Sequence, residues 1–193
     1  MSFETQFPAF PVAEIPAFIR FAVASGYMVD ASWCNEACPS FDFIAPRDGN
    51  ADSNYTHARV FCDRLNPADR DYEGVPRFSV EFYHADGKLE PYTAFSTESE
   101  TEIAKYLGEV MRWSNEYRDH VGHCPFLDDP QDMTPSKAKI TLAEYRLEAA
   151  CEDDTFGKAS ADDVRRYATK IATDMGLALT FDEDGNPAFE ESK

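Results

Sequence analysis

The chain has 193 residues, of which 36 are Asp or Glu and 18 are Lys or Arg, so its formal net charge at pH 7 is -18. Hydrophobic residues make up 43% and aromatic residues 13% of the chain, which excludes a disordered chain too poor in apolar groups to offset the entropy of ordering. A chain of this length is expected to fold as one domain, 1–193, and to bury a sizeable core. Composition therefore favours a folded protein with an acidic surface.

Membrane and secretory signals are missing from the sequence. No run approaches the roughly 18 apolar residues that span a bilayer, and residues 1–30 lack the basic start, apolar middle and cleavage site of a secretory signal. The cysteines are Cys34, Cys38, Cys62, Cys124 and Cys151. Because their number is odd and their density low, they are typical of free thiols in a reducing compartment. We expect a cytoplasmic location and no membrane partner.

The N-terminal half begins with one predicted helix and continues as strands. Residues 13–25 fit a helix with Pro16 in its first turn and Gly26 after its end. Segments rich in strand-forming residues follow at 27–33, 41–44, 58–65 and 77–84, with a polar loop over 47–55. This order predicts a helix that leads into a sheet.

The last of these strands carries the clearest pattern. Phe78, Val80 and Phe82 alternate with polar or amphipathic neighbours, which is the period of a strand with one covered face. Asp86 and Gly87 follow it, and both residues tolerate the positive φ of a tight hairpin turn. We expect antiparallel pairing across this turn.

The C-terminal half is predicted to be mainly helical. Thr97 and Glu100 have the spacing of a capping box, which would open a helix that runs to about Asp119. A loop with three prolines is expected over 121–135. A second capping box, Thr141 with Glu144, predicts a helix that ends near residue 151.

The end of the chain is predicted to be a helix followed by a hairpin. Ser160 would open the helix and Gly176 would end it. Strands are expected at 177–181 and 188–190, around a turn of Asp, Gly and Asn. The predicted fold is therefore α+β, a mainly antiparallel sheet of about five to seven strands covered by three to four helices. A sub-boundary near 120–136 would divide a sheet-rich N-terminal part from a helical C-terminal part.

One set of residues could bind a metal. It consists of Cys34, Cys38, His120, His123 and Cys124. Sulfur and imidazole ligands suit tetrahedral zinc, and the same residues support an alternative function as a small zinc- or thiol-dependent hydrolase. The spacing lacks the paired two-residue gaps of common zinc motifs, and buried thiols with histidines after a helix end explain the same residues. We expect no metal and no cofactor.

Enzyme motifs are missing from the chain. It contains no G-x-S-x-G elbow, no G-x-x-x-x-G-K-S/T loop and no G-x-G-x-x-G turn. The run from Asp182 to Asn186 resembles a calcium loop only superficially, because its glycine is fourth rather than sixth. We therefore expect no catalytic residues.

The acidic residues are gathered into short runs in the C-terminal half. Residues 98–193 contain 22 acidic and 11 basic residues. The runs that we expect to contact a partner are Asp128-Asp129 with Asp132, Glu152-Asp153-Asp154, Asp162-Asp163 and Asp182-Glu183-Asp184. A net charge of -18 exceeds the magnitude of about 2–8 that keeps a small domain in solution, and self-repulsion makes the surplus costly.

A basic partner would explain this surplus. Carboxylates spaced like phosphates can occupy the nucleic-acid-binding cleft of another protein, whereas direct binding to nucleic acid would be opposed by repulsion. We expect a non-enzymatic protein that inhibits such a partner by nucleic-acid mimicry. Charge and size are shared with phage and mobile-element inhibitors such as anti-CRISPR or anti-restriction proteins. Two alternatives are a generic solvated acidic surface and a structural or assembly subunit.

Overall fold

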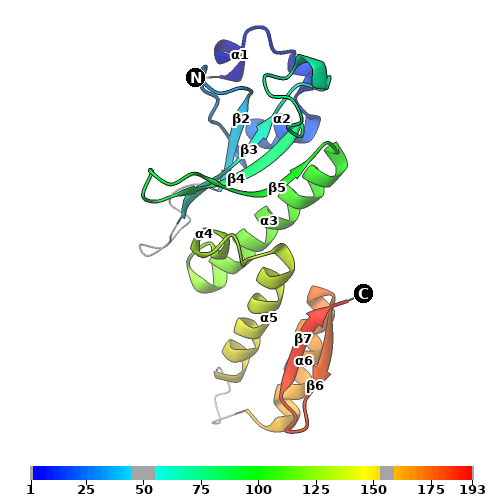
Figure 1. Ribbon diagram of the computed structural model, residues 1–193. Helices are drawn as coiled ribbons and strands as arrows, with labels where there is room; N and C mark the ends of the chain where they lie inside the picture. Colours follow the sequence, from blue (N-terminus) through cyan, green and yellow to red (C-terminus); the bar gives the residue numbers. More distant parts are fainter. Residues whose placement is uncertain (1, 45–54, 153–158, 193) are drawn as a thin grey trace.

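The computed structural model describes residues 2–44, 55–152 and 159–192 (Figure 1). Its helices are α1 (Phe3–Gln6), α2 (Ala17–Ala24), α3 (Glu100–Val121), α4 (Pro125–Asp128), α5 (Pro135–Glu152) and α6 (Ala161–Met175). Its strands are β1 (Val29–Asp30), β2 (Ser40–Ile44), β3 (Tyr55–Cys62), β4 (Phe78–His84), β5 (Tyr92–Thr97), β6 (Leu177–Phe181) and β7 (Pro187–Glu191). The predicted α+β class is confirmed.

The larger sheet is antiparallel throughout, with the five strands in the order β1-β2-β3-β4-β5. Each strand pairs with its neighbour in the sequence, which is the usual arrangement of consecutive strands. Residues 85–91 connect β4 to β5 and contain Gly87, whose φ is 64°. The expected antiparallel pairing of these strands is confirmed. The connection is longer than the tight turn that was predicted, and Asp86 does not have the positive φ that such a turn requires.

One face of this sheet is covered by helices. Val80 lies opposite Val60 and Phe95 in the sheet, and the Phe95 ring stacks on Tyr106 of α3 at 4.4 Å between centroids. The N-terminal segment covers the same face, because Phe41, which lies opposite Val60, contacts the Phe3 ring edge to face. The buried residues therefore form a layer between the sheet and the helices.

The other face of the sheet carries the alternate residues. Asp42, Arg59 and Glu81 lie directly opposite one another on β2, β3 and β4. These side chains are only partly buried. This second face is polar, as period-2 alternation requires of a sheet covered on one side.

Helices α5 and α6 and the β6-β7 hairpin extend away from the sheet (Figure 1). Helix α5 packs against α3 and against α6, and the β6-β7 hairpin packs against α5 and α6. Helix α6 ends at Gly176, whose φ of 60° is the left-handed C-cap that Gly adopts at little cost. The chain then reverses direction and pairs β6 with β7, as predicted.

Helix α3 begins two residues later than the predicted capping box. Ser99 is the N-cap, and its hydroxyl accepts a hydrogen bond from the backbone N–H of Glu102 at 3.3 Å. Thr97 is instead the last residue of β5. The capping-box spacing recurs at both positions, and Ser99 is the cap because it lies directly before the first helical residue, Glu100.

Helix α5 also begins earlier than predicted. It starts at Pro135 rather than near Thr141, and Thr134 accepts a hydrogen bond from the backbone N–H of Lys137 at 3.2 Å. Proline breaks a helix in its interior but fits the first turn, where its missing N–H has no partner to lose. The same reason explains the short helix α4, which begins at Pro125 within the predicted loop.

The first strand is shorter than predicted, since only Val29–Asp30 of 27–33 pairs with β2. The predicted loop over 47–55 lies almost entirely outside the described residues. Within the described part of the chain, no helix is both long enough and apolar enough to cross a bilayer.

Candidate functional site

The fold brings three of the predicted acidic runs to one end of the molecule. We call Glu152, Asp162, Asp163, Asp182, Glu183 and Asp184 the acidic tip. Helix α5 ends there, α6 begins there, and the β6-β7 turn lies beside both (Figure 1). The guanidinium of Arg165 lies 4.9 Å from the centre of the Phe181 ring, so the N-terminal part of α6 lies beside the end of β6. Asp153 and Asp154 lie outside the described residues.

Two carboxylates of the acidic tip hold local structure. Asp163 accepts a hydrogen bond from the Ser160 hydroxyl at 2.6 Å and forms an ion pair with Arg166 at 2.8 Å. Asp182 accepts hydrogen bonds from the side chain and the backbone N–H of Asn186 at 3.0 and 2.7 Å. These contacts, led by the Ser160 hydroxyl and by the Asn186 amide, lower the pKa of Asp163 and of Asp182 below its ordinary value.

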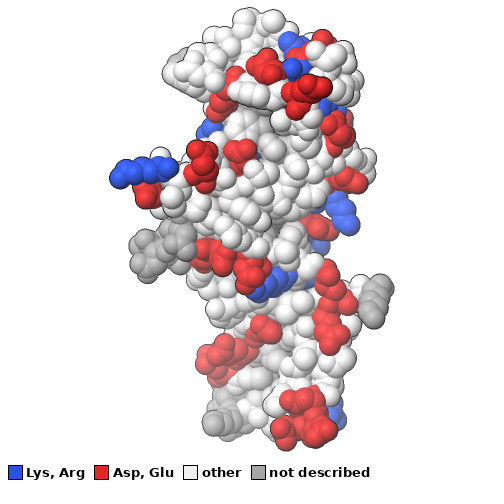
Figure 2. Space-filling model, in the orientation of Figure 1, with Lys and Arg blue, Asp and Glu red and all other residues white. Residues whose placement is uncertain are grey.

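The other carboxylates of the acidic tip are open to solvent. Glu152, Asp162, Glu183 and Asp184 are exposed, and within the described part of the chain none of them forms an ion pair. Figure 2 shows acidic side chains gathered at this lower end of the molecule. They are therefore free to meet a cationic surface.

The fourth acidic run is not part of the tip. Asp128, Asp129 and Asp132 lie at α4 and the start of α5, near the middle of the molecule. Asp128 pairs with His123 at 2.8 Å, and Asp132 pairs with Lys137 at 2.5 Å. Both carboxylates are already partnered, so this run adds less unbalanced charge than the acidic tip.

The metal-ligand candidates lie at opposite ends of α3. The backbone N–H of Cys62 donates to the carbonyl of Pro39, and Cys62 lies in register with Phe78 and Thr97. Cys38 is therefore at the same end of the sheet as the start of α3. His120 and Cys124 are at or beyond its last turn. A helix of 22 residues is about 33 Å long, so the two groups of candidate ligands do not meet.

The candidate ligands make other contacts instead. His120 accepts a hydrogen bond from Arg146 at 3.2 Å, and the buried thiol of Cys124 contacts the Ser114 hydroxyl at 3.4 Å. Cys34 is exposed, and its backbone N–H donates to Gln6 at 3.1 Å. Among the described residues, no group of three or more His, Cys, Asp or Glu side chains is arranged to hold a metal ion.

Buried thiols near the sheet are poor nucleophiles. Burial, followed by the nearby charge of Asp63, raises the pKa of Cys38 far above its ordinary value. Burial likewise raises the pKa of Cys62 to about 12. A nucleophilic cysteine needs a lowered pKa, so these two thiols do not support the hydrolase alternative.

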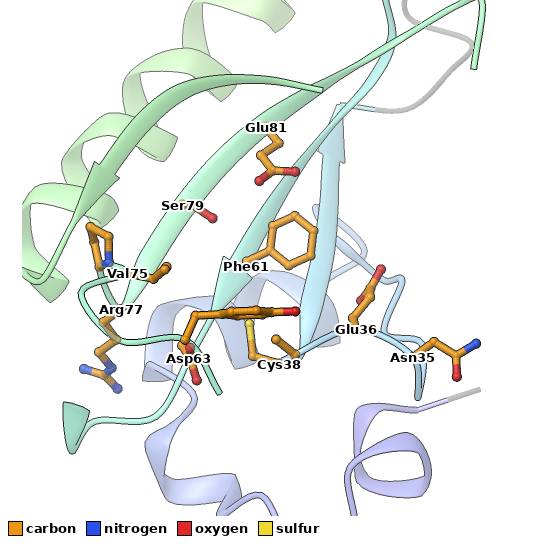
Figure 3. Close-up of a pocket in the computed structure, with 12 residues that line it drawn as sticks. Asn35, Glu36, Cys38, Phe61, Asp63, Val75, Arg77, Ser79 and Glu81 are labelled. Atoms are coloured by element: carbon orange, nitrogen blue, oxygen red, sulfur yellow. The ribbon is translucent and has the colours of Figure 1, made fainter. Parts of the chain in front are cut away.

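The polar face of the sheet contains a pocket that the sequence did not reveal. It has a volume of about 310 Å³ and lies between the sheet and the loops that precede β2 and β4 (Figure 3). The side chains of Glu36, Phe61, Ser79 and Glu81 line it, with the buried Cys38 beneath (Figure 3). In the sequence, polar residues at alternate positions of β3 and β4 indicate that one face of the sheet is uncovered, but they do not indicate a pocket on it.

An ion-pair network borders this pocket. The guanidinium of Arg59 binds Glu36 at 2.9 Å and Asp42 at 2.7 Å, and lies 5.1 Å from the centre of the Tyr83 ring. Glu81, on the neighbouring strand, forms no ion pair within the described part of the chain, and burial raises its pKa. The network links loop, β2 and β3, and it contains no nucleophile paired with a base.

Comparisons of the chain with protein-family models, with curated proteins and with solved structures found no match. Function must therefore be inferred from charge and geometry.

Proposed function

We propose that the protein is a non-enzymatic interaction protein whose acidic tip binds a basic, nucleic-acid-binding partner. By occupying the cationic surface, it would block that partner's access to nucleic acid. The observation that carries this proposal is the convergence of three acidic runs, separated in the sequence, at one end of the molecule. A surplus spread evenly for solubility would not require such convergence.

The acidic tip is held in a defined shape, which supports the proposal. Asp162 is in the first turn of α6, where Ser160 caps the helix. Glu183 and Asp184 are in a turn that Asp182 closes by accepting the backbone N–H groups of Asp184 and Asn186 at 3.0 and 2.7 Å. Carboxylates on fixed backbone lose little conformational freedom on binding, so more of the electrostatic attraction remains as affinity.

Electrostatics would act mainly on the rate and specificity of association. The field of a concentrated negative surface steers a basic partner toward it and can raise the association rate constant about tenfold to a thousandfold. At physiological ionic strength the Debye length is about 8 Å, so only nearby carboxylates reinforce one another. The carboxylates of the tip would therefore act together only where they lie within this distance of one another.

The first test is competition with nucleic acid. Partners are captured from a lysate at low salt, and each purified candidate is then titrated with labelled nucleic acid in the presence of the protein. The proposal predicts that the protein displaces nucleic acid from its partner at near-stoichiometric concentration. A partner that binds the protein and nucleic acid together would contradict mimicry.

Matched variants locate the contact. Asp162→Asn, Glu183→Gln and Asp184→Asn combined remove three charges from the tip but keep Asp163 and Asp182, which hold its shape. The control removes three exposed acids from the sheet part, by Asp71→Asn, Glu73→Gln and Glu90→Gln. Competition should be lost in the tip variant and retained in the control. Equal loss in both would indicate a response to total charge instead of to a site.

A further inference from the structure

A groove between α3 and the start of α5 is lined by more cationic than acidic side chains. It has a volume of about 500 Å³, and its lining includes Lys105, Gly108, Arg112, Ser136 and Lys139. The chain has twice as many acidic as basic residues, yet three cationic side chains line this groove against two carboxylates, Glu109 and Glu191. A groove on α6 has the same ratio, with Arg165, Arg166 and Lys170 against Asp162 and Asp174. The groove lies on α3, away from the acidic tip.

The three cations differ in how far they are already engaged. Lys105 is exposed and forms no ion pair within the described residues. Arg112 pairs with Glu116 at 2.9 Å and lies 4.4 Å from the Trp113 ring centre. Lys139 donates to the carbonyl of Gly176 at 3.1 Å. Each retains donor N–H groups, because ammonium and guanidinium carry three and five donors.

The chain itself places a carboxylate in this groove. Glu191, at the end of β7, accepts a hydrogen bond from the Ser136 hydroxyl in the first turn of α5. The N-terminus of an 18-residue helix adds its positive dipole at this point. The groove therefore has the donors that a carboxylate needs, and a peptide glutamate already uses one of them.

Gly108 leaves the backbone of α3 uncovered within the groove. It lies in the interior of α3 with ordinary helical dihedrals, and a Cβ atom built on it would meet nothing within 4 Å. Glycine is the weakest ordinary helix former, and no packing contact explains its presence here. Lys105 and Arg112 are three residues before it and four residues after it, so all three lie on one face of the helix.

The spacing of these residues sets the size of the occupant. Lys105 and Arg112 are seven residues apart, which is about 10 Å along the helix axis. Gly108 lies between them and leaves bare backbone as the floor. A ligand that rests on this floor could place one anionic group near each cation.

We propose that the groove binds a small ligand that carries two or more carboxylate or phosphate groups, held by Lys105, Arg112 and Lys139 over Gly108. The proposal is independent of the acidic tip, because it concerns another surface and a ligand of opposite charge. Binding would depend on the cationic side chains of the groove itself, since the net charge of -18 repels anions from the rest of the surface.

Titration calorimetry with citrate and with pyrophosphate tests this proposal, since the two probes distinguish carboxylate from phosphate recognition. Sodium chloride at matched ionic strength corrects for screening. The intact protein should bind at least one probe saturably with one site per chain. Absence of saturable binding for both probes at millimolar concentration and low salt would overturn the proposal.

Two variants and one control locate the site. Lys105→Gln should weaken binding about tenfold or more, because it removes one charge-assisted contact. Gly108→Leu should abolish binding, because the leucine side chain would occupy the space above the backbone at position 108. The melting temperature of this variant should stay at or above that of the wild type, since leucine favours the helix. Lys88→Gln, which removes the same charge from the exposed β4-β5 turn, should leave binding unchanged. Unchanged affinity in Gly108→Leu, or equal weakening in Lys88→Gln, would contradict the assignment.

Discussion

Gly108→Ala is predicted to stabilise the protein. The new Cβ atom would meet nothing within 4 Å, so no clash opposes the gain in helix propensity. Alanine exceeds glycine by about 0.8–1.0 kcal/mol in a helix interior, and for a chain of this size about 1 kcal/mol raises the melting temperature by about 2–4 °C. Urea unfolding at pH 7 should show a higher midpoint with an unchanged m-value, because the surface exposed on unfolding is the same.

A matched substitution makes this prediction sharper. Gly176→Ala introduces the same methyl group at a φ of 60°, where a side chain strains the backbone. This variant should lose about 1–2 kcal/mol of unfolding free energy. If Gly108→Ala were instead destabilising while Gly176→Ala behaved as expected, the floor of the groove would not be open and the reasoning would fail.

Three further predictions concern pH, thiols and a helix cap. Burial raises the pKa of Glu81, so the ionisation of this carboxyl group opposes folding as pH rises. In urea unfolding, Glu81→Gln should be more stable than the wild type at pH 7 but not below about pH 3.5, where the wild-type group is protonated in both states. A loss of stability in this variant at pH 7 would contradict the reasoning. Iodoacetamide should modify the exposed Cys34 in the native protein and the buried Cys38 only in denaturant; mass spectrometry that found Cys38 modified first would refute the assignment. Ser160→Ala should cost about 0.5–2 kcal/mol in the same urea assay, and no loss would mean that this cap is unimportant.

Local chemistry made much of the fold predictable. Ser160 and Gly176 bound α6 as predicted, because a hydroxyl cap and a left-handed glycine act through neighbouring backbone alone. The antiparallel pairing of β4 with β5 was likewise found. Such signals depend on only a few consecutive residues, so one sequence is enough to read them.

Competing local signals explain the errors. Thr141 and Glu144 have the spacing of a capping box, yet they lie inside α5, because Pro135 opens the helix six residues earlier. Spacing alone does not show whether the preceding residues are already helical. Packing against α3 and α6 favours the longer helix.

The candidate sites depend on contacts between distant residues. The acidic runs were identified in the sequence, but only the fold shows that Asp162 and Asp184 share one end while Asp129 lies elsewhere. The pocket beside Glu81 and the groove over Gly108 were not predicted, because single polar residues and one glycine carry no spacing signal. The sub-boundary near 120–136 stays a prediction.

The central claim is that the acidic tip binds a basic partner, and the salt dependence of binding tests it most directly. The affinity of a captured partner is measured by titration between about 50 and 200 mM salt, a range over which multiple charge contacts weaken binding steeply. The combined change of Asp162, Glu183 and Asp184 should lower both the affinity at low salt and the slope of log affinity against log salt, while the control variant matches the wild type. A wild-type affinity that barely changes with salt, or equal slopes for the tip variant and the wild type, would contradict the account.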